Sequence, residues 1–201
     1  MTSSPAPDDR PRIAFNASWP ALIKLVLVYS GLHLLYGLLD DAWLSAVAYR
    51  VAFTEPAAAM IRLIAPDEPI AVMAHELRSP QLVLAIVRGC DGSGAWFLLT
   101  AALLAVGGSC RAVLCGLGLG GLAVYGMNLL RLVALYWIGT RAPQWFDAAH
   151  EYVFPGLLVV GVLAFVLVWS TSQAQGSAAA AQGCPPSVPR QDQPEPQQQQ
   201  G

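Results

Sequence analysis

Residues 87–99 read VRGCDGSGAWFLL, and this stretch decides how the rest of the chain is arranged. It begins with polar and small residues and then becomes apolar, so it marks the point at which a segment in water leads into a membrane helix. Cys90 lies at that point, and Gly89 and Gly92 on either side of it allow the backbone to bend sharply. A helix N-terminus and a nearby cation, here Arg88, both lower the pKa of a thiol, so Cys90 is a candidate nucleophile.

The composition indicates a protein that is embedded in a lipid bilayer. Of the 201 residues, 55% are hydrophobic and only 12% are charged, whereas about 25% are charged in an ordinary soluble domain. The net charge of −2 and the lack of a clustered basic face exclude nucleic acid as a partner. The four cysteines form no CxxC pair and match no zinc spacing, so neither a metal nor a cofactor is expected.

The apolar runs predict an all-α polytopic membrane protein with about four spans, at 20–39, 92–108, 112–138 and 150–169. The second is short and needs tilt or a thinned bilayer. The first could be a cleaved signal peptide, but its length favours an uncleaved anchor. Small residues recur every four positions at Ala112, Gly116 and Gly120, a spacing that allows helices to approach closely in lipid.

Three other segments are predicted to lie outside the spans. Residues 1–19 form a flexible N-terminal segment, and 170–201 form a disordered tail, because Ala, Gln, Ser and Pro cannot bury a core. Between the first two spans, the short apolar runs at 43–53 and 56–65 contain arginines and suit helices that lie at the membrane interface. The apolar runs at 70–73 and 81–87 predict a small β-hairpin that leads into Cys90.

Two further motifs are Asn128-Leu-Leu-Arg131, which lies about two turns before the end of the third span, and Phe146-Asp-Ala-Ala-His150, which leads into the fourth. Since consecutive spans alternate in direction, both motifs and Cys90 are expected on one side of the membrane. An arginine within a span costs about 2.5–3.5 kcal/mol and therefore usually faces the bundle interior with a partner. Asn128 shares its helical face, and Asp147 is expected to cap the next helix or to orient the His150 imidazole.

With these residues, the sequence resembles the exosortase/archaeosortase family of polytopic membrane transpeptidases. The matching residues are Cys90-Asp91-Gly92, Asn128-Leu-Leu-Arg131 and His150, and the resemblance covers about 83–169. It implies a cysteine endopeptidase and transpeptidase, a hydrolase in which Cys90 is the nucleophile. Arg131 would stabilise the developing negative charge, and His150 would be the general acid and base. Asp91 departs from the family, in which serine is commoner, and an acid at that position opposes thiolate formation.

The resemblance also implies partners and a location. The substrates are exported proteins whose C-terminal sorting signal consists of a short motif, a hydrophobic span and a basic cluster. The sequence does not identify the acceptor nucleophile or the motif. The protein would lie in the cell inner (cytoplasmic) membrane with its active site on the extracytoplasmic side. Lysines and arginines divide evenly between the two sides, so the residues themselves do not set the orientation.

Two other functions are compatible with the same residues. In the first, the protein is a non-catalytic membrane subunit in which Arg131 and Asn128 bind a lipid head group or a component of an extracellular polymer. In the second, it is a different thiol enzyme, such as an acyltransferase, that uses the same three residues.

Overall fold

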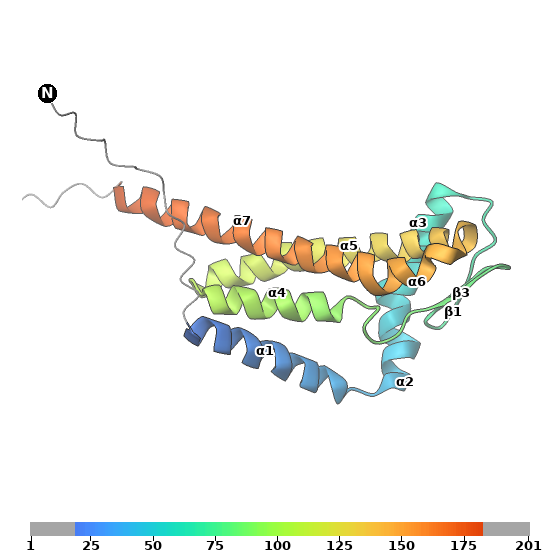
Figure 1. Ribbon diagram of the computed structural model, residues 1–201, viewed down its shortest axis with the longest axis horizontal. Helices are drawn as coiled ribbons and strands as arrows, with labels where there is room; N and C mark the ends of the chain where they lie inside the picture. Colours follow the sequence, from blue (N-terminus) through green and yellow to red (C-terminus); the bar gives the residue numbers. More distant parts are fainter. Residues whose placement is uncertain (1–18, 183–201) are drawn as a thin grey trace, which may run out of the picture.

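The computed structural model describes residues 19–182. The predictions for 1–18 and 183–201 therefore lie outside the described residues. Within the described part, the chain is mostly helical and carries one small sheet at an end of the helical bundle (Figure 1).

Within residues 19–182, three helices are long and apolar enough to cross a membrane, which indicates a multi-pass membrane protein. They are α1 (Trp19–Gly37), α5 (Cys110–Arg141) and α7 (Phe154–Gln182), the last continuous with a π-helical turn, η4 (Ala149–Val153). At ~1.5 Å per residue, the 19 residues of α1 extend about 28 Å, close to the ~30 Å of a hydrocarbon core. Three of the four predicted spans thus have the length that a membrane requires.

The remaining predicted span, the second one at 92–108, is a shorter helix, α4 (Ser93–Val106). Its 14 residues extend only about 21 Å, because a glycine with a positive φ stops it at each end. Gly92 has φ +78° and Gly107 has φ +80°. Helix α4 is therefore shorter than a membrane span requires. It packs against α1, α5 and α7, which enclose it.

The predicted small-residue contacts on α5 are present. A Cβ atom added at Gly120 would lie 2.6 Å from Phe165 and 2.9 Å from Leu99, and one added at Gly116 would lie 2.9 Å from Trp169. These distances are too short for any side chain. The glycines therefore allow α4 and α7 to pack directly on the α5 backbone.

The predicted interfacial helices form one helical segment that crosses the end of the bundle (Figure 1). It consists of α2 (Asp41–Trp43), the π-helical η1 (Leu44–Ala48) and η2 (Arg50–Thr54), and α3 (Glu55–Ile64). The sequence predicted a break before Pro56. The helix continues through Pro56, which has no N–H to donate to the Ala52 carbonyl four residues earlier; that carbonyl accepts a hydrogen bond from the Tyr125 hydroxyl at 2.7 Å instead.

The sheet corrects the predicted hairpin. It is antiparallel, with the order β1-β2-β3, and its strands are β1 (Ala71–Met73), β2 (Glu76–Arg78) and β3 (Val83–Ala85). The two runs that were expected to pair form β1 and β3, and β2 lies between them. The sequence therefore predicted a sheet at this place but not its third strand. Strand β2 was missed because its one buried residue, Leu77, is flanked by the charged Glu76 and Arg78.

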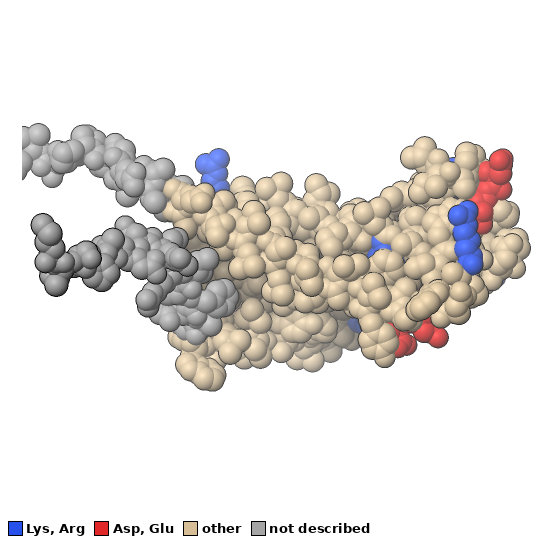
Figure 2. Space-filling view, turned by 45° about the horizontal axis from the view of Figure 1, so that its top comes forward, with Lys and Arg blue, Asp and Glu red and all other residues tan. Residues whose placement is uncertain are grey.

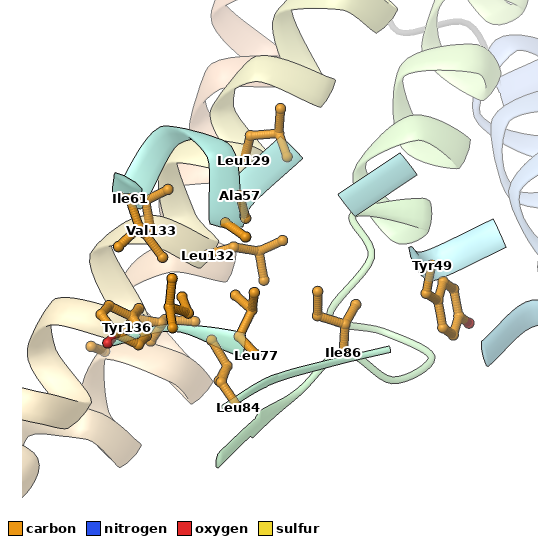
Figure 3. Close-up of a cluster of buried hydrophobic side chains, with 14 of the residues drawn as sticks. Tyr49, Ala57, Ile61, Leu77, Leu84, Ile86, Leu129, Leu132, Val133 and Tyr136 are labelled. Atoms are coloured by element: carbon orange, nitrogen blue, oxygen red, sulfur yellow. The ribbon is translucent and has the colours of Figure 1, made fainter. Parts of the chain in front are cut away.

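The sheet is held to the bundle by a hydrophobic core. Leu77, Leu84 and Ile86 from the sheet segment pack with Ile61 of α3 and with the C-terminal half of α5, notably Leu132 and Tyr136 (Figure 3). On the face shown in Figure 2, charged side chains gather at this end, while the body made by the long helices is nearly uncharged. That distribution suits a body in lipid and an end in water.

Helix α7 continues to Gln182, so the disorder predicted from residue 170 is wrong for 170–182. The hydroxyls of Ser170, Thr171 and Ser172 bond to carbonyls one turn earlier. Residues 178–181, which follow, are all alanine, and alanine has the highest helix propensity of any residue type.

Candidate active site

Cys90 lies in a tight turn between β3 and α4. Its backbone N–H donates to the Val87 carbonyl at 2.9 Å, and Gly89 and Gly92 both adopt left-handed conformations, with φ of +91° and +78°. Position 92 needs glycine for a second reason, because an added Cβ would lie 2.9 Å from Cγ of Asn128. The predicted supporting role of Gly92 therefore has a steric explanation.

The Cys90 thiol contacts the His150 imidazole. The distance from Sγ to Nε2 is 3.0 Å, although the two residues lie 60 positions apart in the sequence. The π-helical turn η4 presents the imidazole, and the Phe146 ring stacks on it with centroids 5.7 Å apart and an interplanar angle of 6°. With Nε2 facing the thiol, the imidazole can accept the thiol proton.

Arg131 and Asn128 complete the predicted group. Arg131 is 5% exposed and donates from Nη2 to the His150 backbone carbonyl at 3.3 Å. Asn128 is 1% exposed and donates from Nδ2 to the Cys90 carbonyl at 3.3 Å. Among the described residues, Nε of Arg131 and Oδ1 of Asn128 have no hydrogen-bond partner. The site therefore holds a buried donor and a buried acceptor that a bound ligand could satisfy.

Burial sets the protonation of the thiol. It raises the pKa of Cys90, and the Arg131 charge and the backbone contact at Val87 oppose this without reversing it. Asp91 adds a smaller effect that also raises the pKa. The sequence predicted a lowered pKa, and this is wrong because the turn removes the thiol from water. The resting site thus contains a neutral thiol beside the imidazole.

Asp147 does not take either predicted role. It is exposed, and the structure shows no hydrogen bond from it to His150 within the described residues. It is also not a cap, because α6 (Phe146–Ala148), the short helix that contains it, has no side-chain capping bond. The stacked Phe146 orients the imidazole in its place.

Sequence reasoning missed two residues around the turn, Tyr36 and Tyr49, and it missed the contacts that Asp91 and Arg88 make. Asp91 is buried and accepts a hydrogen bond from the Tyr36 hydroxyl, which also bonds to the Tyr49 hydroxyl. Tyr36 lies near the end of an apolar span and Tyr49 within an interfacial helix, so neither showed a polar pattern. Arg88 donates to the backbone carbonyls of Tyr36 and Leu39 at the end of α1.

A cavity of about 280 Å³ lies beside Asn128, between α1, η2, α4 and α5. Its polar edge consists of Asp91, Ser93 and Asn128, and its walls are mainly aromatic: Tyr36, Phe53, Trp96, Phe97 and Tyr125. No cluster of three or more metal-ligating side chains occurs in the part of the chain that the structure describes.

In comparisons with known proteins, no family model, curated protein or solved structure matches the chain.

Proposed function

We propose that this chain is a membrane-embedded cysteine endopeptidase and transpeptidase of the exosortase/archaeosortase type. The observation that carries the proposal is the 3.0 Å contact between Sγ of Cys90 and Nε2 of His150, beside the buried Arg131. A thiol, an imidazole and a guanidinium from three distant segments form one partly buried group. That set provides a nucleophile, a base and a stabiliser of negative charge.

The first half of the reaction follows from the protonation state of the pair. His150 takes the proton of the neutral Cys90 thiol at Nε2 as sulfur attacks the scissile carbonyl carbon. The carbonyl π electrons move to oxygen, and the Arg131 charge stabilises the resulting oxyanion, an interaction that is strong where water is scarce. Collapse of this tetrahedral species breaks the C–N bond. The leaving amine takes the proton from His150, and a thioester remains on Cys90.

The second half releases the product. An acceptor nucleophile loses its proton to His150 as it attacks the thioester carbonyl, and the Cys90 sulfur leaves and regains that proton. With an acceptor amine or hydroxyl the result is transfer, and with water it is hydrolysis. The identity of the acceptor follows from no residue of the site, so transfer is the part of the proposal that rests on the family resemblance.

The proposed topology has four spans, with α4 as the short second one. The support for this is that α4 is apolar and is enclosed by α1, α5 and α7, so that protein covers much of a helix too short to span unaided. The proposed location is the cell inner membrane, with Cys90 and the sheet on the extracytoplasmic side. The proposed partners are exported proteins with a C-terminal motif, span and basic cluster.

The decisive experiment replaces the nucleophile in the native cell. A Cys90→Ala strain is compared with a Cys115→Ala strain, since Cys115 is an exposed cysteine on α5 away from the site. Proteins of the same genome that end in a shared motif, a span and a basic cluster should stay uncleaved only in the Cys90→Ala strain. Normal clipping in a Cys90→Ala strain with normal protein levels would end the enzyme proposal.

Mass spectrometry of the trapped intermediate separates the remaining alternatives. The transpeptidase predicts a peptide joined to Cys90 through a thioester that hydroxylamine releases. An acyltransferase predicts a fatty acyl group at the same sulfur, and a non-catalytic subunit predicts no adduct at all.

A further inference from the structure

The turn that carries Cys90 is closed by the carboxylate of Asp91, which is 8% exposed. Its Oδ1 accepts hydrogen bonds from the Gly89 backbone N–H and from the Ser93 hydroxyl, both at 3.0 Å. Its Oδ2 accepts one from the Tyr36 hydroxyl at 2.6 Å. The carboxylate thus joins the residue before Cys90, the first turn of α4 and helix α1.

Tyr36 is also held by Arg88, which lies on the other side of Cys90 in the same turn. The Arg88 guanidinium donates to the Tyr36 backbone carbonyl, and its Cζ lies 4.8 Å from the centre of the Tyr36 ring. Arg88 also donates to the Leu39 carbonyl at 3.0 Å and pairs with Asp41. Residues on both sides of Cys90 are therefore anchored to the end of α1.

A second hydroxyl extends the connection. The Tyr49 hydroxyl lies 2.7 Å from that of Tyr36, and Tyr49 is 4% exposed within the helical segment that crosses the bundle. Tyr36 therefore joins the turn to α1 and to this crossing segment at once. A turn with two left-handed glycines has little conformational preference of its own, so these contacts decide its shape.

We propose that Asp91 and Tyr36 are positioning residues, which hold the Cys90 turn so that its thiol faces the His150 imidazole. The negative charge of Asp91 disfavours the thiolate, so its contribution is geometric. The inference deepens the proposed function, on which it rests for its catalytic meaning. The placement of the thiol can, however, be measured without any substrate.

The test is a proximity measurement in membranes on the full-length chain. Cys110, Cys115 and Cys184 are changed to Ser, and His150→Cys is introduced, so that the only thiols lie at 90 and 150. A short thiol-specific bifunctional reagent then joins them. Tyr36→Phe removes one hydrogen bond from the turn and should reduce the cross-linked fraction about fivefold, the ratio expected for the loss of one net hydrogen bond. Asp91→Ala removes three hydrogen bonds and should reduce the fraction at least as much.

Tyr125→Phe is the matched control. Its hydroxyl donates to the Ala52 carbonyl at 2.7 Å, so this variant also removes one tyrosine hydrogen bond to the crossing segment but does not touch the turn. It should leave the cross-linked fraction unchanged. Tyr36→Phe keeps the ring that packs on Phe97, which guards against a variant that fails to fold.

Each outcome bears on the inference. Unchanged cross-linking in both Tyr36→Phe and Asp91→Ala overturns it, and so does an equal loss in Tyr125→Phe. In the otherwise unmodified chain, a loss of position should lower kcat for processing and leave KM unaltered. If no tailed protein is processed but cross-linking still falls, the proposed function fails and the positioning role stands. If processing falls but cross-linking is unchanged, the positioning role fails and the proposed function stands.

Discussion

At the scale of single residues, the charge of Arg131 is the larger of two effects that oppose the burial of the Cys90 thiol, the other being the backbone contact at Val87. Removing that charge should raise the thiol pKa further, because a cation favours the thiolate. For Arg131→Gln, the pH at which iodoacetamide alkylation of Cys90 reaches half its maximal rate should therefore rise, by on the order of one unit. The background should lack the other three cysteines.

Arg141→Gln serves as the control for this measurement. Arg141 is exposed, and its Cζ lies 4.2 Å from the centre of the Trp137 ring. Its replacement should therefore leave the pH profile of Cys90 alkylation unchanged. A profile for Arg131→Gln that stays unchanged or moves to lower pH would show that the guanidinium does not act on the thiol.

Gly92 supports a prediction about stability. Gly92→Ala places a side chain in a left-handed conformation and 2.9 Å from Asn128 Cγ, so it should destabilise the fold by about 1–3 kcal/mol. Gly126→Ala, where an added Cβ meets nothing within 4 Å, should be neutral or slightly stabilising. Thermal unfolding in detergent compares the two variants, and equal midpoints would contradict the steric explanation.

At the scale of helices and strands, the contact of α5 with α4 and α7 depends on glycine. Gly120→Ala drives a methyl group into Phe165 and Leu99 and should cost about 1–3 kcal/mol. Gly118→Ala, two positions along the same helix and facing open space, is the matched control. Protease resistance of the membrane-embedded protein should fall for Gly120→Ala alone; if both variants resist equally, the helices do not pack as described.

The same scale shows what the sequence could predict. Long apolar runs predicted α1, α5 and α7, because a membrane helix needs little beyond length and hydrophobicity. Strand β2 escaped because Leu77 is buried by contacts with Ile61, Leu132 and other distant residues rather than by a local pattern. The raised pKa of Cys90 escaped for the same reason: burial is a tertiary property.

The convergence of Cys90, Asn128, Arg131 and His150 was predictable from topology alone, since alternating helices must place these segments at one end. The contacts that fix the turn were not, because Tyr36 is a lone tyrosine in an apolar run. Only the packing of α1 on α4 brings its hydroxyl to Asp91.

At the scale of the whole molecule, the proposed four-span topology predicts that two exposed sites lie on opposite sides of the membrane. Arg78 lies in the sheet at one end, and Cys110 begins α5 at the other (Figure 1). If α4 crosses the membrane between them, a membrane-impermeant maleimide should reach Arg78→Cys from one face and Cys110 only from the opposite face. Labelling of both positions from the same face would reduce the topology to three spans.

The level of Asn128 along α5 has a consequence for any polypeptide that meets the thiol. Asn128 bonds to the carbonyl of Cys90, yet α5 continues to Arg141, about 20 Å further at ~1.5 Å per residue. The turn that carries Cys90 therefore lies beside the middle of α5 and well short of the C-terminal end of that helix. If the proposed function holds, the bond that Cys90 attacks lies close to the level at which the apolar helix α4 begins, and hence close to the place where the partner chain would enter the lipid.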